Sequence, residues 1–369
     1  MSAATVAEFQ AIARRRLPRF LVDYLEGGAI TEQTLRRNER DFADIAIEQR
    51  VLRDISAVDT RVHLFGQEVA MPVVLAPVGM AGMYGRRGEH AAAEAAAAAG
   101  IPFTLSTVSI CEMGEVFAGA PAGAHWFQLY VTKDRGLTQA LVERAREMRA
   151  GALVVTVDMP LPGIRYRDRR SGLSGPTGWA QKARLYAQAA ARPGWALNVG
   201  LRGRPHVFGN LSRASQGDFS VGGFWSWMSD NFDPTVTWTD IEAIRRQWTG
   251  PLIIKGILHP DDAKRAVALG ANGIVVSNHG GRQLDGAATA VAVLPAIRDA
   301  SGDMTVLVDG GVRSGVDVYR AVRRGAHAVM IGRPWVYALA ADGQRGVATL
   351  LETFRREFSI TLALSGERL

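Results

Sequence analysis

Short apolar runs recur along the chain, and a helical pattern of apolar and polar positions follows each one. The runs occupy residues 71–77, 101–107, 125–131, 152–160, 251–257, 273–279, 304–311 and 328–334. Runs of this length that alternate with helical segments are typical of buried parallel strands. Eight such units predict an α/β fold, a closed (β/α)8 TIM barrel, with an open doubly wound sheet as the alternative.

Two stretches depart from this repeat. Residues 1–70 precede the first strand, and we expect an N-terminal helical extension there with a small lid over the bottom or side of the barrel. Residues 161–240 form a long insertion after the fourth strand. A connection this long in a compact domain is functional or mobile. We therefore expect one domain over 1–369 that carries both additions.

Composition narrows the class of protein. With 369 residues and 47% hydrophobic residues, the chain can bury a large core. The only cysteine, Cys111, excludes an internal disulfide and fits a reducing compartment. The sequence has neither the apolar run of a secretory signal at its start nor a stretch of about 18 apolar residues, so we expect no membrane-spanning helix.

Charge is unevenly distributed. The stretch 160–217 contains ten Lys or Arg and one acidic residue, Asp168, so its charge is +9. The rest of the chain sums to −2, which gives the net charge of +7. Aromatic residues accompany it: Trp179, Tyr186, Trp195, Phe208, Phe224, Trp225 and Trp227. Basic residues mixed with aromatic ones favour contact with an anionic membrane surface, and a solvated loop with buried Trp anchors is the alternative. No nucleic-acid recognition motif accompanies the charge, so nucleic acid is not an expected partner.

Polar residues stand at the ends of the predicted strands, where barrel enzymes carry their active sites. Buried polar side chains are costly unless they are paired or used. The set is Ser106, Gln128, Tyr130, Thr156, Asp158, Lys255, Ser277, His279 and Asp309, with Arg165, Arg282, Arg313 and Arg333 close behind.

The last two strands predict a phosphate site. The segments "DGGVRSG" (309–315) and "IGRP" (331–334) supply glycine N–H groups and two arginines, Arg313 and Arg333. Loops in these positions hold a phosphate in many barrels, although tight turns alone would also explain the glycines.

Two residues suggest chemistry. Lys255, in an otherwise apolar strand, could form a Schiff base, face an anion or extend to the rim. His279 offers a proton acceptor beside Arg282, which suits a carboxylate, and a buried structural histidine is the alternative. No C-x-x-C, H-x-x-x-H, acidic cluster or serine nucleophile elbow occurs, so neither a metal site nor a serine hydrolase is predicted.

The motifs resemble a known family. "SNHGGRQLDG" (277–286), "VDGGVRSGVDVYRAV" (308–322) and "IGRP" are similar to segments of the FMN-dependent 2-hydroxy-acid dehydrogenases and oxidases. "LVDYLEGGA", "LAPVGM", "TLSTVS", "WFQLYV" and "TVDMP" match in the same order, over nearly the whole chain. "YLEGGAITEQTLRRN", "PGIRYRD" and "WALNVGLRGRPHVFGN" are similar to the bacterial membrane-associated L-lactate dehydrogenase branch.

The resemblance implies FMN as cofactor and assigns residues to it. The phosphate would lie on the backbone of Gly311, Gly332 and Arg333, near Arg313. The ring would be held by Ser106, Gln128 and Thr156, with the backbone of Pro77, Val78 and Gly79 against it. Lys255 would face its N1/O2 edge, and Ser277 and Asp309 would belong to the same cofactor site.

The resemblance also implies a reaction. Tyr24, Arg165 and Arg282 would hold the substrate carboxylate, Tyr130 would bond the hydroxyl, and His279, paired with Asp158, would take its proton. The expected reaction is oxidation of L-lactate to pyruvate by a homotetramer bound to the cytoplasmic face of the inner membrane, with quinone as acceptor. Gly79 stands where many oxidases of the family carry Ala, which bears on oxygen reactivity in a direction that stays open.

The sequence leaves alternatives open for the substrate, the electron acceptor and the function. The substrate could be mandelate or another aryl 2-hydroxy acid, and the electron acceptor could be oxygen. A barrel isomerase or lyase that uses Lys255 and a phosphate site, or a non-catalytic binder of a phosphate ligand, would use the same strand ends.

Overall fold

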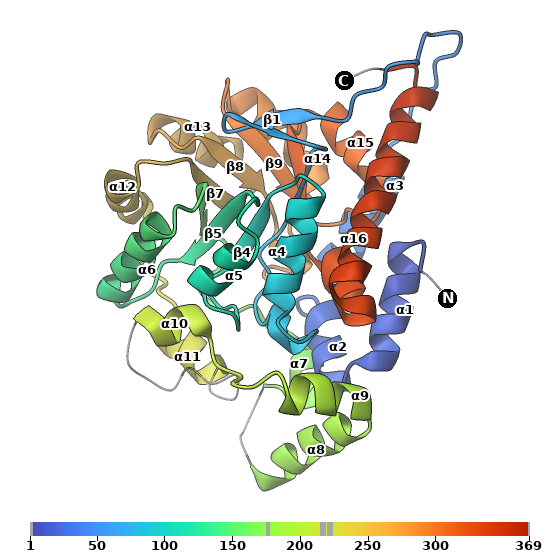
Figure 1. Ribbon diagram of the computed structural model, residues 1–369. Coiled ribbons are helices and arrows are strands. Elements are labelled where there is room, and N and C mark those ends of the chain that lie inside the picture. Colours follow the sequence, from blue (N-terminus) through green and yellow to red (C-terminus); the bar gives the residue numbers. More distant parts are fainter. Residues whose placement is uncertain (1–2, 175–177, 215–218, 220–223, 368–369) are drawn as a thin grey trace.

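A closed barrel of eight parallel strands forms the centre of the molecule (Figure 1). The computed structural model describes residues 3–174, 178–214, 219 and 224–367. The strands are β3 (Val73–Leu75), β4 (Phe103–Ser106), β5 (His125–Tyr130), β6 (Ala152–Thr156), β7 (Leu252–Ile257), β8 (Gly273–Val276), β9 (Thr305–Asp309) and β10 (Ala328–Ile331). Because β10 pairs with both β9 and β3, the sheet is closed, which confirms the predicted barrel and excludes the open sheet.

A helix follows each strand and covers the outside of the barrel. These helices are α4 (Gly88–Ala98), α5 (Met113–Gly119), α6 (Arg135–Glu147), α12 (Trp238–Gln247), α13 (Pro260–Ala268), α14 (Ala290–Ala300), α15 (Gly315–Arg323) and α16 (Arg333–Leu364). Helix α16 is kinked, since the backbone of Asp342 and Gly343 leaves the helical region.

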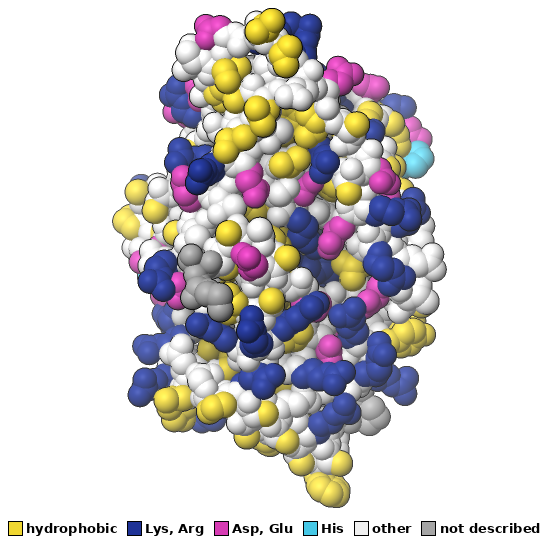
Figure 2. All heavy atoms as spheres, turned by 90° about the vertical axis from the view of Figure 1, so that its right-hand side faces the viewer, with side chains coloured by type: hydrophobic (Ala, Val, Ile, Leu, Met, Phe, Trp, Pro, Cys, Tyr) yellow, Lys and Arg dark blue, Asp and Glu magenta, His cyan; other side chains and the backbone are white. Residues whose placement is uncertain are grey.

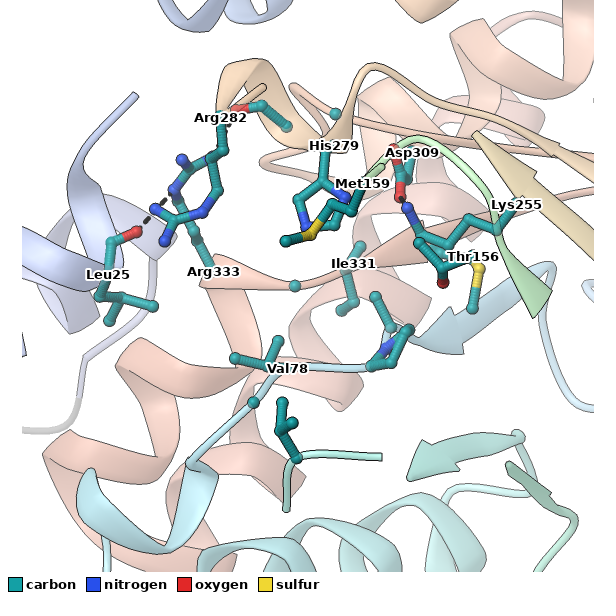
Figure 3. A pocket seen from close by; sticks show the side chains of 18 of the residues that line it. Leu25, Val78, Thr156, Met159, Lys255, His279, Arg282, Asp309, Ile331 and Arg333 are labelled. Atoms are coloured by element: carbon teal, nitrogen blue, oxygen red, sulfur yellow. Dashed lines mark hydrogen bonds and ion pairs between the residues drawn. The ribbon is translucent and has the colours of Figure 1, made fainter. Parts of the chain in front are cut away.

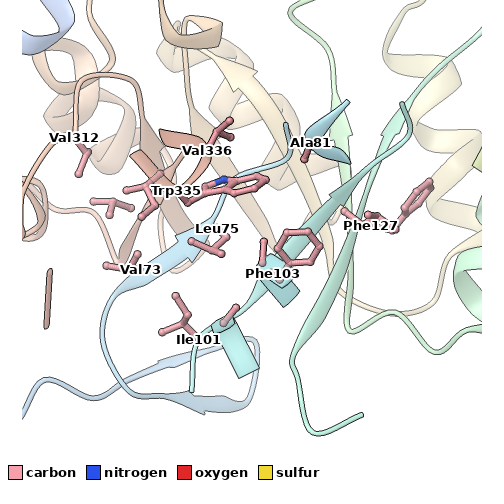
Figure 4. Close-up of a cluster of buried hydrophobic side chains, with 14 of the residues drawn as sticks. Val73, Leu75, Ala81, Ile101, Phe103, Phe127, Val312, Trp335 and Val336 are labelled. Atoms are coloured by element: carbon pink, nitrogen blue, oxygen red, sulfur yellow. The ribbon is translucent and has the colours of Figure 1, made fainter. Parts of the chain in front are cut away.

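The core has two shells because successive strand side chains point to opposite faces. Val154 and Ile253 point into the barrel, whereas their neighbour Val155 packs outward under the helices. Figure 4 shows the outer shell around Trp335, whose indole N–H donates to the Ala76 carbonyl at 3.2 Å. Burial of both faces accounts for the continuous apolar runs in the sequence.

The N-terminal extension covers both ends of the barrel. It comprises α1 (Val6–Arg16), α2 (Arg19–Glu26), α3 (Gln33–Ala43) and an antiparallel hairpin of β1 (Val62–Leu64) and β2 (Gln67–Val69). The hairpin closes the N-terminal end, where Phe65 meets Trp126 edge to face at 5.6 Å between ring centroids. The expected lid corresponds to this hairpin, whereas α2 lies at the opposite, C-terminal end, where Tyr24 and Leu25 line a pocket.

The segment between β6 and α12 contains further helices: α7 (Tyr166–Ser171), α8 (Trp179–Ala190), α9 (Pro193–Trp195), the π-helical turn η2 (Ala196–Leu201), α10 (Gly209–Ala214) and α11 (Phe224–Asn231). They lie together at the lower end of the molecule in Figure 1. Met228 and Phe232 line the same pocket as the C-terminal strand ends, so this segment helps to cover the mouth of the barrel. Helix α8 itself buries no residue among those described.

Candidate active site

The C-terminal strand ends surround one pocket, and most of the residues predicted from the sequence line it (Figure 3). These are Tyr24, Pro77, Val78, Gly79, Tyr130, Thr156, Arg165, Lys255, His279, Arg282, Asp309, Gly311, Arg313, Gly332 and Arg333. The other four, Ser106, Gln128, Asp158 and Ser277, do not line the pocket but bond to one another or to residues that do. The structure thus brings together residues spread over more than 300 positions.

His279 and Asp158 form a pair at the pocket wall. The distance between His279 Nδ1 and Asp158 Oδ1 is 2.8 Å, and the His279 backbone N–H donates to Ser277 Oγ at 3.0 Å. Gly256, at φ 115°, permits this approach, because a Cβ there would lie 2.6 Å from the Asp158 Cβ. Burial lowers the pKa of His279, and the Asp158 carboxylate offsets this only in part. The imidazole is therefore neutral at neutral pH, and with Nδ1–H donated to Asp158, Nε2 is free to accept a proton.

Lys255 is charged and paired. Its Nζ lies 2.9 Å from Asp309 Oδ2 and donates to Ser277 Oγ at 2.8 Å. Burial alone would lower the pKa of Lys255, but the carboxylates of Asp309 and Asp158 outweigh burial and raise it. Because a Schiff base requires a neutral amine, this environment favours the anion-facing interpretation of Lys255 over covalent chemistry.

Two guanidinium groups meet over one aromatic ring. Arg282 Cζ lies 4.9 Å and Arg165 Cζ 5.9 Å from the Tyr24 ring centroid. Burial, with the Arg282 charge second, lowers the pKa of Arg165 to about 10, so Arg165 stays charged at neutral pH. A pair of guanidinium groups in one pocket suits a planar carboxylate, which would bond to both of them.

Gln283 lies within the "SNHGGRQLDG" motif, but the sequence pattern indicated no role for it. Its amide N–H groups donate to the carbonyls of Asp158 and Leu161 at 3.1 and 2.9 Å. Its Oε1 accepts from Arg165 at 3.3 Å and from the Gly163 N–H at 3.1 Å. Gln283 therefore joins the loop after β6 to the loop after β8 and orients Arg165.

Glycine and arginine define the other end of the pocket. Gly311 has φ 102°, and a Cβ there would lie 2.1 Å from the Asn38 carbonyl oxygen, so only glycine fits. Arg333 donates to the carbonyls of Leu25, Gly27 and Gly280, and burial lowers its pKa to about 9. Arg313, at the same end, pairs with Glu39 at 2.8 Å, whereas Arg333 forms no ion pair among the described residues. Glycine backbone beside the charge of Arg333 suits a phosphate.

Polar groups behind the pocket have bonding capacity to spare. Ser106 Oγ donates to Gln128 Oε1 at 3.2 Å, across the paired strands β4 and β5. Gln128 Nε2 is buried and has no hydrogen-bond partner among the described residues. A buried amide donor without a partner is costly. An isoalloxazine ring, with carbonyl and nitrogen acceptors along its edge, would satisfy this donor.

Several pocket residues carried no readable signal in the sequence. Met159, Met228 and Phe232 add an apolar wall, and the Tyr130 hydroxyl lies 3.4 Å from Met159 Sδ. Met and Phe at these places look like ordinary core residues until the fold brings them to the pocket.

Asp168 does not line the pocket but is buried next to Arg165, with 4.0 Å between its Oδ2 and Arg165 Nη1. Burial raises the pKa of Asp168 to about 6.

Comparison with known proteins identifies the class. Residues 13–368 match the family model described as FMN-dependent dehydrogenase. The chain therefore belongs to the FMN-dependent dehydrogenase family, and FMN is its cofactor.

Curated relatives and solved structures agree with this. An L-lactate dehydrogenase of Caulobacter vibrioides is 54% identical over 369 residues, which cover 100% of this chain and 95% of that protein. One from Pseudomonas syringae pv. syringae is 52% identical, with 99% and 96% covered. The crystal structure of the monotopic membrane protein (S)-mandelate dehydrogenase matches with a TM-score of 0.93 at 33% identity, covering 100% and 96% of the two chains. Mandelate oxidase matches with a TM-score of 0.84 at 37% identity, covering 99% and 95%.

More particularly, this protein is an FMN-dependent 2-hydroxy-acid dehydrogenase, an oxidoreductase that acts on a small 2-hydroxy acid. This assignment excludes the isomerase, lyase and non-catalytic alternatives. The described residues contain no group of His, Cys, Asp and Glu able to hold a metal ion.

Proposed function

We propose that the enzyme oxidises L-lactate to pyruvate with His279 as the general base. The observation that carries this proposal is the juxtaposition of a neutral, Asp158-bonded histidine with two arginines, Arg165 buried and Arg282 partly buried, in one pocket. The high identity to proteins named L-lactate dehydrogenase supports the substrate.

The chain's own residues would position the substrate and move a proton. Arg165 and Arg282 bind the carboxylate, with Tyr24 between them. Tyr130 bonds the hydroxyl, and because burial raises its pKa well above the usual value, it stays protonated as a donor. His279 Nε2 accepts a proton from the substrate, and Asp158, whose lowered pKa keeps it ionised, stabilises the resulting imidazolium.

FMN, when bound, supplies the two-electron acceptor. The backbone of Pro77, Val78 and Gly79, together with Ser106, Gln128 and Thr156, would hold the ring. Lys255 would place positive charge at its edge, supported by Ser277 and Asp309. Gly311, Gly332, Arg313 and Arg333 would hold the phosphate end. Positive charge from Lys255 would stabilise negative charge at that edge of the ring.

A larger substrate, such as mandelate, is the second candidate because a further cavity adjoins the substrate pocket. This cavity of about 280 Å³ shares Tyr130, Thr156, Met159 and Phe232 with the pocket. An aryl substituent directed past Met159 would enter it. The likeness to (S)-mandelate dehydrogenase and mandelate oxidase gives this candidate further support.

An absorbance spectrum of the purified protein, before and after anaerobic addition of substrate, tests both candidates. We expect a yellow flavin spectrum that bleaches with L-lactate. Bleaching by (S)-mandelate but not by L-lactate would move the substrate to the aryl class. Peroxide release in air at the rate of lactate turnover would make oxygen the acceptor.

We further propose that the enzyme associates peripherally with the cytoplasmic face of the membrane and passes electrons to quinone. No helix in the described ranges is long and apolar enough to cross a bilayer. Exposed apolar side chains instead occur on α8 and η2: Trp179, Tyr186, Leu197 and Leu201. Figure 2 shows hydrophobic side chains at the lower end of one face and many Lys and Arg above them, an arrangement that suits the interface of an anionic membrane.

The aromatic residues of the basic stretch do not all belong to this surface. Phe208 is fully buried, and the Trp195 indole N–H donates to the Met83 carbonyl at 2.8 Å, so both act as anchors. The side chains of Phe224 and Trp225 lie outside the described residues. Trp179 and Tyr186, 85% and 74% exposed, remain as interfacial candidates.

Vesicle sedimentation tests the surface. Removal of residues 177–215 would also delete buried Phe208 and Asn210, so surface substitutions are the cleaner test. The triple variant Trp179→Ser, Leu197→Ser, Leu201→Ser should lose most of its binding to phosphatidylglycerol vesicles. The matched control is Leu52→Ser, Val267→Ser, Ile360→Ser, which removes exposed apolar groups elsewhere. Equal binding by both variants would refute the surface.

The family resemblance also leads us to propose a homotetramer. Light scattering on the purified enzyme would measure its mass, and a monomer mass would refute this proposal.

A further inference from the structure

A third cavity lies beside the active site, on the side of the molecule where α1 and α9 lie in Figure 1. Its volume is about 530 Å³, and it forms where the end of α1, the turn before α4, α9 with η2, and the kink of α16 meet. Four arginines line it: Arg15, Arg16, Arg86 and Arg192. We call it the arginine groove. Tyr84 lines both this groove and the flavin pocket and so forms part of the wall between them.

The charge of the groove is not neutralised within the described part of the chain. None of the described residues that line it is acidic, and none of its four arginines forms an ion pair there. Arg192 donates to the carbonyls of Leu17 and Ala191, which hold the guanidinium in place without cancelling its charge. Like charges that line one groove repel one another, so a bound anion would stabilise the groove.

Arginines next to the groove, unlike those that line it, have acidic partners. Arg14, one position before the groove, lies 2.6 Å from Glu26. Asp342, one position before Gly343 in the groove wall, holds Arg345 at 2.5 Å. The acidic residues near the groove are thus already paired with other arginines.

Apolar residues form part of the remaining lining of the groove. Leu17, Pro193, Trp195, Leu339 and Ala340 line it, and the Trp195 ring is fixed edge to face against Phe20 at 6.0 Å. A cationic rim with an apolar floor suits an amphiphile, whose phosphate would meet the arginines while its carbon chain meets the floor. A free inorganic phosphate would leave the floor unused.

The groove also borders the surface that we propose meets the membrane. Asn198 and Val199 line the groove, and Leu197 and Leu201 in the same π-helical turn are 49% and 59% exposed. In Figure 2 the Lys and Arg side chains gather on the lower half of this face, next to the hydrophobic end. We propose that the arginine groove binds the headgroup of one anionic phospholipid per chain. The proposal rests on the membrane association proposed above and adds a defined, saturable site to it.

Titration calorimetry of the full-length holoenzyme with dihexanoyl phosphatidylglycerol, kept below its micelle concentration, tests this site. We expect saturation at one lipid per chain and at least tenfold weaker binding by Arg15→Gln, Arg86→Gln. The control Arg246→Gln, Lys264→Gln removes the same charge from α12 and α13, and it should bind as the wild type does. Turnover of L-lactate should be unchanged in both variants, because none of these residues lines the pocket.

Other results would overturn the headgroup site or separate it from membrane association. Equal weakening by the two variants, or inorganic phosphate binding as tightly as the lipid, would overturn the headgroup site. Wild-type enzyme that sediments with phosphatidylglycerol vesicles but does not bind the short-chain lipid would overturn the groove and leave membrane association standing. Binding of the short-chain lipid without sedimentation would support the groove and contradict membrane association.

Discussion

At the scale of single residues, the chemistry depends on how burial and neighbouring charges set the protonation state of each group. His279 is kept neutral by burial, whereas Asp158 and Lys255 are kept charged by their partners. The pocket therefore holds one proton acceptor, while the adjacent charged groups stay in a fixed state.

Replacement of His279 should separate binding from catalysis. His279→Gln removes the proton acceptor but leaves the flavin contacts, so we expect kcat with L-lactate to fall about 10²- to 10⁴-fold. The flavin spectrum should be retained. Stopped-flow reduction of the flavin measures the loss, and reduction at the wild-type rate would remove His279 from its role.

The pH dependence follows from the same pair. Because burial lowers the pKa of His279 below 6.5, kcat/KM should be constant at neutral pH and fall only in the acid range below that value. Asp158→Asn removes the interaction that raises this pKa, so the acid limb should move to lower pH while the plateau falls. A limb that moves to higher pH would contradict the pairing.

Asp168 should make stability depend on pH. Burial raises its pKa from 3.8 to about 6, so the folded state favours the protonated form. The stability it contributes is fully present below about pH 4 and lost as pH rises through about 6. At pH 8, Asp168→Asn should therefore raise the free energy of unfolding by roughly 1–3 kcal/mol, with little gain at pH 4. Urea unfolding at the two pH values measures this, and an equal effect at both would refute it.

At the scale of elements, the loops after β3 and β4 approach closely beside the flavin pocket. A Cβ at Gly79 would lie 2.8 Å from Val108 Cγ2, which is a physical reason for glycine at this position. Substitutions here change loop spacing before they change chemistry.

Gly79→Ala should therefore destabilise the fold by about 1–3 kcal/mol through overpacking. Val108→Ala in the same chain removes the clash, so the double variant should recover most of that loss. Thermal unfolding of the two single variants and the double variant measures the coupling. Additive effects would show that the two loops do not press on each other.

At the scale of the whole molecule, charge is segregated: the stretch 160–217 carries +9 and the remainder −2. The basic stretch belongs to the segment at the lower end of the molecule, beside the mouth of the barrel. An anionic surface would thus attract the molecule in one orientation, with the pocket near that surface.

Salt should weaken this attraction. Raising ionic strength from about 0.05 to 0.5 M shortens the Debye length to a few ångströms, so binding to phosphatidylglycerol vesicles should fall several-fold. Turnover of L-lactate in solution should change much less. Sedimentation and activity assays on the same samples measure both, and salt-independent binding would show that apolar contacts dominate.

The sequence by itself determined the barrel, because parallel strands buried on both faces appear as continuous apolar runs between helical patterns. It also indicated the pocket, since polar residues such as Lys255 and His279 at strand ends are costly unless used. Only the tertiary structure decided where α2 lies, that Phe208 is core, and that Gln283 and Asp168 support Arg165. The bond between Arg165 and Gln283 joins residues more than 100 positions apart. Asp168 is only three positions from Arg165, but its burial, like that of Phe208, comes from the folded chain, so no local pattern records these facts. The arginine groove belongs to the same class: its arginines come from three separate segments, and their shared lack of acidic partners exists only in the folded chain.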